Sequence, residues 1–135
     1  MRSKWISLFA GGFVILSISS CATVPTETLA SGELRLLSMD LPQREDIRLN
    51  FPFVVNINFE ADGKPEIRTA CFSFSGDGPY CLKVTDITYG SPGTIKVQVR
   101  AKNSGSQVLE SYALYIKDGK PRPTNVVSSH IRVVP

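Results

Sequence analysis

Hydrophobic and polar residues alternate with a period of two over much of the chain. From Phe51 to Glu60 the odd positions carry Phe, Phe, Val, Ile and Phe, while Pro, Val, Asn, Asn and Glu fill the even ones. Ile95, Val97, Val99 and Ala101 alternate in the same way with basic and amide side chains. Alternation of β-branched and aromatic residues indicates half-buried β-strands. No stretch keeps a helical period for more than two turns.

Turn-forming clusters of Gly, Asp, Asn, Ser and Pro separate the alternating runs, at 62–65, 76–79, 90–93, 103–105 and 118–121. The sequence predicts strands at about 33–38, 47–60, 66–75, 80–88, 93–102, 109–117 and 125–134. Five apolar residues on one strand face need a second layer to bury them. Seven strands with regularly spaced turns therefore predict an all-β, immunoglobulin-like (Ig-like) antiparallel sandwich. Transthyretin-like or jelly-roll topology would give much the same pattern.

The C-terminal third consists of a tyrosine-containing run at Tyr112–Ile116, an Asp-Gly-Lys turn and a final alternating run at Asn125–Val133. These residues resemble the last two strands of fibronectin type III and related Ig-like domains. In that family a Tyr at the start of strand F forms the tyrosine corner, and the resemblance implies this role for Tyr112. No Trp is present in the predicted strands, so Phe72 or Phe74 would fill the core of strand C.

The first 20 residues have the layout of a secretory signal. Arg2 and Lys4 precede an uncharged and strongly apolar run from Trp5 to Ser20. As a helix, this run of about 16 residues would span roughly 24 Å, which is shorter than a hydrocarbon core of about 30 Å. Cleavage is therefore favoured over a permanent membrane span.

The residues from Ile18 to Cys21 read Ile-Ser-Ser-Cys. This segment resembles the lipobox of bacterial lipoproteins, in which an aliphatic residue and two small residues precede the modified Cys. The resemblance implies that Cys21 becomes the first mature residue and carries a diacylglyceryl group and an acylated amine, with palmitate among the acyl chains. Ala22, where an Asp would retain the protein at the inner membrane, implies the outer membrane, facing the periplasm. An ordinary secretory signal with an incidental Cys is the alternative.

Three segments follow from this reading: a signal peptide at 1–20, a lipidated N-terminus and flexible tether at 21–31, and an Ig-like domain at 32–135. The full chain has 15 Lys and Arg against 12 Asp and Glu, a formal charge of +3. Removal of the signal leaves 13 basic residues against 12 acidic ones. This near-neutral balance does not suggest nucleic-acid binding.

Cys71 and Cys81 flank the predicted turn at 76–79. Pairing them across a hairpin places Phe72 opposite Tyr80 and puts apolar residues on the other face, which is a consistent register. Disulfides persist in exported proteins, so a cross-hairpin disulfide is expected, worth roughly 2.7 kcal/mol. A redox-active pair is the alternative, but the CxxC spacing of thioredoxin-like proteins is absent.

Candidate chemistry is sparse. His130 is the only His, and its expected place is the solvent-facing side of the last strand. No Gly-x-Ser-x-Gly elbow is present. Asp62, Asp77 and Asp118 lie in Gly-containing turns, and no loop offers the roughly six oxygen ligands that Ca²⁺ requires. The sequence predicts no catalytic residue, no metal site and no cofactor.

Two surface features could bind a partner. Lys96, Arg100 and Lys102 form a basic stripe on one strand, and Tyr80 and Tyr89 lie near loops rich in Gly and Pro. A solvated strand face and local packing are the simpler readings of these residues. We expect a lipid-anchored, non-enzymatic structural or protein-interaction module of the cell envelope. The alternative is a module that binds peptidoglycan or another glycan through Tyr80, Tyr89 and the basic stripe. The sequence does not indicate an oligomeric state.

Overall fold

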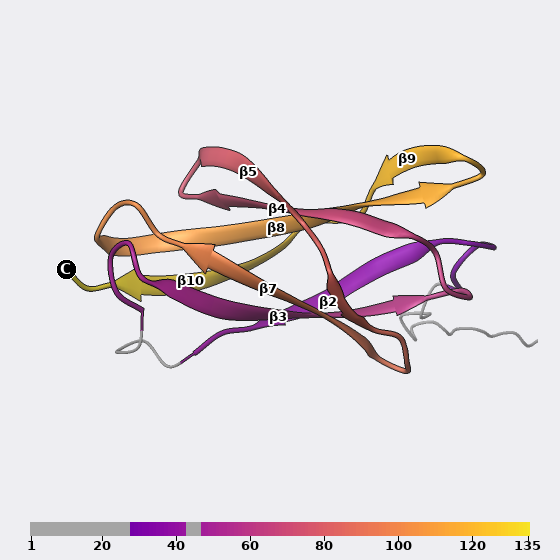
Figure 1. Cartoon of the computed structure of the whole chain (residues 1–135), viewed down its shortest axis with the longest axis horizontal. Helices are drawn as coiled ribbons and strands as arrows, with labels where there is room; N and C mark the ends of the chain where they lie inside the picture. The colour runs from indigo at the N-terminus through magenta and orange to yellow at the C-terminus, as the bar shows by residue number, and fades with distance from the viewer. Residues whose placement is uncertain (1–27, 43–46) are drawn as a thin grey trace, which may run out of the picture.

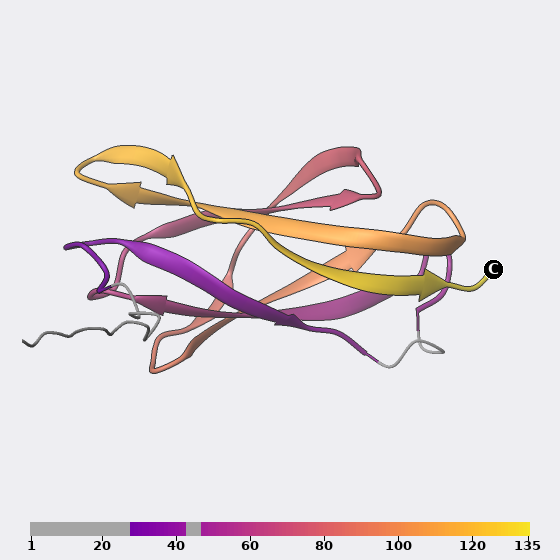
Figure 2. The same cartoon turned by 180° about the vertical axis from the view of Figure 1, so that it is seen from behind.

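The computed structural model describes residues 28–42 and 47–135, in which nine strands form two antiparallel sheets packed as a sandwich (Figure 1). One sheet has the order β2 (Leu34–Asp40), β3 (Pro52–Ala61), β7 (Gly93–Arg100) and β6 (Asp86–Thr88). The other has the order β10 (Val127–Val133), β8 (Gly105–Lys117), β4 (Ile67–Phe74) and β5 (Asp77–Lys83), and β9 (Lys120–Pro123) also pairs with β8. Seen from behind, β9 and β10 follow one another along the same edge of β8 (Figure 2).

The strand order confirms the predicted Ig-like sandwich. In Ig nomenclature the first sheet reads A-B-E-D and the second reads G-F-C-C′, with the strands in that letter order along the chain. β9 and β10 together take the place of strand G, because β9 pairs with Leu114–Lys117 and β10 with Gly105–Ser111. The chain therefore has Ig-like topology rather than that of a jelly roll.

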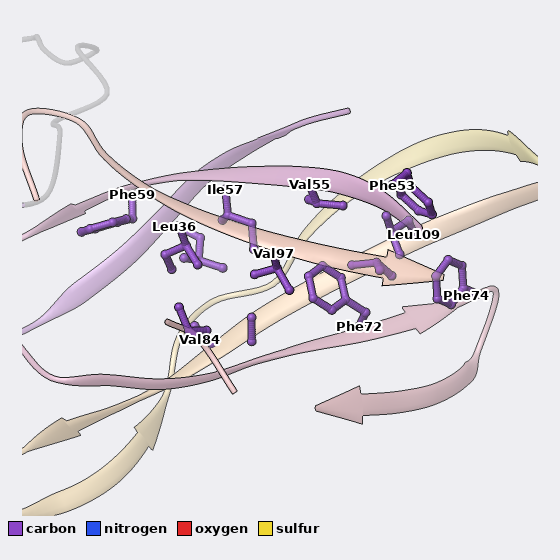
Figure 3. Close-up of a cluster of buried hydrophobic side chains, with 14 of the residues drawn as sticks. Leu36, Phe53, Val55, Ile57, Phe59, Phe72, Phe74, Val84, Val97 and Leu109 are labelled. Carbon is purple, nitrogen blue, oxygen red and sulfur yellow. The ribbon is translucent and has the colours of Figure 1, made fainter. Parts of the chain in front are cut away.

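Inward-facing side chains of the two sheets form one hydrophobic core (Figure 3). β3 buries every second residue, as its alternation predicts, and β7 does the same from Gly93 to Val99. Phe51 does not belong to this core, because it precedes β3 and remains 63% exposed. The largest fully buried side chains of the core are Phe59, Phe72, Ile47, Ile57, Ile95 and Leu109. Phe72 and Phe74 thus fill the core of strand C, as expected.

The predicted strand at 80–88 is wrong, because this run forms two strands in different sheets. β5 ends at Lys83 and β6 begins at Asp86 on the opposite sheet. The buried Val84 lies at the crossing. β9 is a further strand that the sequence did not predict, since part of the expected turn at 118–121 continues the hairpin from β8.

β8 packs on the core through Leu109, Ala113 and Tyr115, which are buried. Tyr112 and Leu114 lie on the other face and are half-buried. Tyr112 sits in the middle of β8, opposite Cys71 of β4. It therefore does not occupy the position at the start of strand F from which a tyrosine corner forms.

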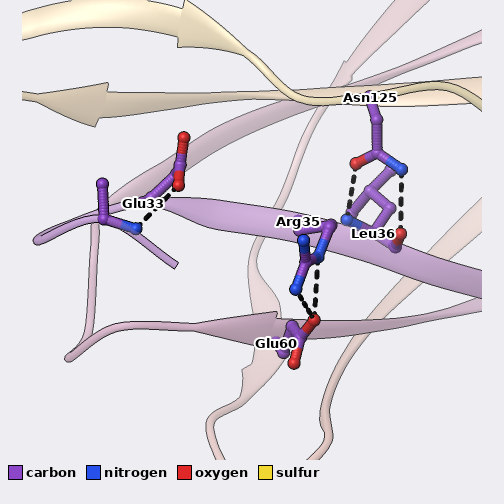
Figure 4. A network of polar contacts seen from close by, with 6 residues as sticks. Glu33, Arg35, Leu36, Glu60 and Asn125 are labelled. Atoms are coloured by element: carbon purple, nitrogen blue, oxygen red, sulfur yellow. Dashed lines mark hydrogen bonds and ion pairs between the residues drawn. The ribbon is translucent and has the colours of Figure 1, made fainter. Parts of the chain in front are cut away.

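One side of the sandwich is closed by polar contacts between the two sheets. The side-chain amide of Asn125 pairs with the backbone of Leu36, accepting from its N–H at 2.8 Å and donating to its carbonyl at 2.9 Å (Figure 4). At the other end of β10, Arg48 and Val134 form a parallel bridge. The residues from 47 to 49, predicted as the start of the second strand, therefore join the end of β10 instead of continuing β3.

Candidate functional site

The opposite side of the sandwich is open, because β6 is too short to cover β7. β6 pairs with Thr94–Lys96 only, whereas β7 continues to Arg100. Just before β6, the N–H of Val84 still donates to the carbonyl of Arg68 in the other sheet, at 3.1 Å. The chain therefore reaches β7 only at Asp86. Within the described part of the chain, no strand pairs with the rest of β7 on this side.

A pocket of about 280 Å³ lies between β5 and β7 at this open side. Its buried lining consists of Phe72, Phe74 and Val99, and the half-buried Leu82 joins them. Its exposed lining consists of Tyr80, Gln98, Arg100 and Lys102. An apolar hollow rimmed by a few polar side chains is the usual form of a binding site. The pocket contains three of the five residues that the sequence predicts as a binding surface.

Tyr80 is the aromatic residue of this rim. It lies on β5 opposite Phe72 and is 38% exposed. Its hydroxyl donates to the carboxylate of Asp77 at 3.0 Å, and this hydrogen bond, with partial desolvation and the nearby negative charge, raises its pKa above the ordinary value. The ammonium of Lys102 lies 5.1 Å from the centre of the Tyr80 ring, within the range of a cation–π interaction. Tyr80 is thus held by Asp77 at its hydroxyl and by Lys102 over its ring.

The rim is basic. Arg100 donates from Nη1 to the carbonyl of Asn50 at 3.0 Å, which keeps its guanidinium beside the start of β3. Lys96 lies farther along the same face of β7, opposite Asp86 of β6. None of the residues that line the pocket carries a carboxylate. A negatively charged group would therefore meet Arg100 and Lys102 in the pocket wall, and the Asp77 carboxylate lies at the edge of the site, bonded to the Tyr80 hydroxyl.

Tyr89 does not join this site. Its hydroxyl donates to the carbonyl of Pro65 at 2.5 Å, and its ring packs edge-to-face on Phe59 with centroids 5.8 Å apart. Burial, followed by the charge of Glu66, raises its pKa. Phe59 lies opposite Gly93 at the start of β7, whereas the pocket lies at the end of that strand. The structure therefore does not bring the two predicted tyrosines together.

The disulfide between Cys71 and Cys81 is present and joins β4 to β5. The predicted register is confirmed, with Ala70 opposite Leu82 and Phe72 opposite Tyr80. Cys71 is fully buried, which fits a structural disulfide. The disulfide holds Cys81, the residue after Tyr80, to β4 and so fixes this part of the edge strand β5.

His130 lies exposed on β10, as the sequence predicts. It lines a hollow of about 350 Å³ together with Asp40 and Ser129. However, the structure shows no hydrogen bond between His130 and either residue in the described chain, and Asp40 instead accepts from Asn58. A nucleophile–base–acid relay requires such bonds. This hollow therefore carries no assembled triad.

Within residues 28–42 and 47–135, no three His, Cys, Asp or Glu side chains gather as a metal site. The same residues contain no helix long and apolar enough to cross a membrane. The predicted signal peptide and Cys21 lie outside the described residues. The sequence did not reveal the apolar half of the pocket or Asp77, the partner of Tyr80. Asp77 is three positions from Tyr80 on the same strand, whereas Val99 of β7 meets Phe72, Phe74 and Leu82 only through the packing of the two sheets.

No protein-family model matches the chain, and no curated protein matches its sequence. What the protein binds is therefore inferred from its own residues.

Proposed function

We propose that this protein is a lipid-anchored, non-enzymatic module of the bacterial cell envelope that binds a partner protein at the pocket between β5 and β7. The observation that carries the proposal is the set of Tyr80, Arg100 and Lys102 around an apolar pocket beside the free edge of β7. Aromatic and Arg side chains are the residue types enriched at the centres of protein interfaces. The disulfide between Cys71 and Cys81 supports an oxidising compartment.

The position of the pocket suits an anchored protein. Leu34, where β2 begins, lies opposite Ala61 at one end of β3, and Arg100 lies opposite Pro52 at the other end. Ten residues of strand separate these ends by roughly 30 Å. With Cys21 in the membrane, the end of β7 that lines the pocket would lie away from the point where the chain enters the sandwich at β2 (Figure 1).

The anchor is tested by labelling cells with radioactive palmitate. The wild-type protein should carry the label, and Cys21→Ala should not. Label retained by Cys21→Ala would show that the lipobox reading is wrong.

The binding site is tested by in-cell crosslinking with a photoreactive amino acid at the position of Lys102. The matched control carries the same group at Lys120, which is exposed on β9 at the other end of β8. A single defined protein crosslinked at the first position, and not at the second, is expected. Equal crosslinking at both positions, or none at Lys102, would contradict the proposed site.

Glycan binding is the second candidate, and it is favoured by the exposed ring of Tyr80 beside Lys102. Sugars pack on such rings, but the second ring expected from the sequence is engaged with Phe59. This candidate predicts saturable binding to purified cell wall that is lost in Tyr80→Ala. Cell-wall fragments crosslinked at Lys102, without a protein, would place glycan binding first.

A further inference from the structure

The pairing of β7 with β3 shows which of its residues direct their N–H and C=O groups to the free edge. In an antiparallel strand each residue directs its N–H and its C=O to the same side, and successive residues alternate between the two sides. The carbonyl of Ala101 accepts from Asn50 on the β3 side, at 2.9 Å. Pro52, opposite Arg100, has no N–H to give. Gln98 and Arg100 therefore direct their N–H and C=O groups away from β3, to the side on which β6 has already ended.

A strand added antiparallel to this edge would have a fixed side-chain pattern. Residues directly opposite one another in an antiparallel pair place their side chains on the same face. The residue opposite Val99 would therefore enter the pocket between the sheets, where Val99 is buried. The residues opposite Gln98 and Arg100 would lie on the outer face, with the side chains of Arg100 and Lys96.

The size and charge of the site define what such a strand would carry. A cavity of 150 Å³ binds benzene, so a pocket of about 280 Å³ admits one aromatic or large aliphatic side chain. Arg100 and Lys96 make the outer face of β7 positive, although Asp86 lies opposite Lys96, and Lys102 adds a positive charge at the pocket rim, where the Asp77 carboxylate accepts from Tyr80. Acidic side chains are complementary to this outer face.

We propose that the free edge of β7 binds an extended segment of the partner protein as an added strand with the pattern acidic–apolar–acidic. The apolar side chain lies opposite Val99 in the pocket, and the two acidic residues pair through their backbones with Gln98 and Arg100. Backbone pairing supplies affinity and the pocket supplies selectivity, as in other cases of strand addition. This inference rests on the proposed function, because it specifies the chemistry of the partner at the same site.

The test uses the full-length protein in mild detergent and a fluorescent pentapeptide, Glu-Thr-Glu-Phe-Glu, whose last residue would lie opposite Gln98 and so stop short of the place that β6 fills. Binding is followed by anisotropy, and the contact is mapped by amide NMR shifts. We expect saturable binding, with the amides of Gln98 and Arg100 shifted and protected from exchange. A peptide N-methylated on the two Glu residues that flank Phe should bind about tenfold more weakly. Methylation on Phe itself, whose N–H would point away from β7, should have little effect.

Protein variants provide the second half of the test. Lys102→Glu should weaken peptide binding about tenfold, and Lys120→Glu, far from the pocket, should not. A peptide with Lys in place of Glu should not bind. Equal binding of both N-methylated peptides, or shifts away from β7, would overturn strand addition. If in-cell crosslinking at Lys102 still captures one protein while strand addition fails, the proposed function stands and only this mode of binding is wrong.

Discussion

Replacing Asn125 by Ala should lower the free energy of unfolding by about 2 kcal/mol. The amide of Asn125 makes two hydrogen bonds to Leu36, at 2.8 and 2.9 Å, and both are partly buried. Each such bond contributes a net of about 0.5–1.5 kcal/mol, and the change leaves two backbone groups of β2 without partners. For a domain of about 100 residues, 2 kcal/mol corresponds to a decrease in Tm of roughly 8–16 °C.

The assay is urea unfolding, followed by circular dichroism, in buffer without a reducing agent so that the disulfide stays intact. Asn103→Ala is the matched control, since Asn103 is exposed and its side chain takes part in none of the hydrogen bonds shown by the described residues. Asn125→Asp keeps an acceptor for the N–H of Leu36 but sets a carboxylate against its carbonyl, so it should not restore stability. If Asn125→Ala stays within about 0.5 kcal/mol of the wild type, as ordinary surface substitutions do, the amide does not hold the two sheets together.

Two further predictions concern the strands that form the pocket. The double variant Cys71→Ala/Cys81→Ala should lose roughly 2.7 kcal/mol of unfolding free energy. Reduction of the wild-type protein should have a similar effect. Mass analysis that finds two free thiols in the native protein would contradict this prediction. Because the Asp77 carboxylate raises the pKa of Tyr80, Asp77→Asn should move the ionisation of Tyr80 to lower pH. The difference in tyrosinate absorbance between each protein and its Tyr80→Phe counterpart measures this shift, and an unchanged titration would refute the role of Asp77.

The strand alternation could be predicted from the sequence because it records burial directly. β3 and β7 each have one face against a core and one against water, so their side chains alternate. The run from Tyr80 to Thr88 gave no sign of its division. Its apolar residues suit either sheet, and the change of sheet at Val84 depends on which edges are free after β4 and β7 have paired.

Tyr80, Arg100 and Lys102 of the candidate site could be predicted as surface residues, but their grouping around an apolar pocket could not. Tyr80 and Lys102 are 22 positions apart, Tyr80 on β5 and Lys102 just after the end of β7 in the other sheet, so only the packing of the sandwich shows that they meet. Gly93 illustrates the same limit. The sequence predicts it as the last residue of a turn and the first residue of the strand, but does not show that an added Cβ would lie 2.3 Å from the ring of Phe59. A close contact of this kind requires a Gly but leaves no local pattern.

The chain enters the sandwich at one end, and the end of β7 that lines the pocket lies at the other. This arrangement determines how the domain would bear mechanical load. With Cys21 anchored and a partner held near Arg100, tension would pull β2 lengthwise past β3. All the hydrogen bonds between these two strands, which pair from Leu34 to Asp40, would then resist together instead of breaking one after another from an end. The Asn125 amide would add resistance in the same direction. With the proposed anchor and partner in place, the fold would hold its partner under tension without unravelling from the end at β2.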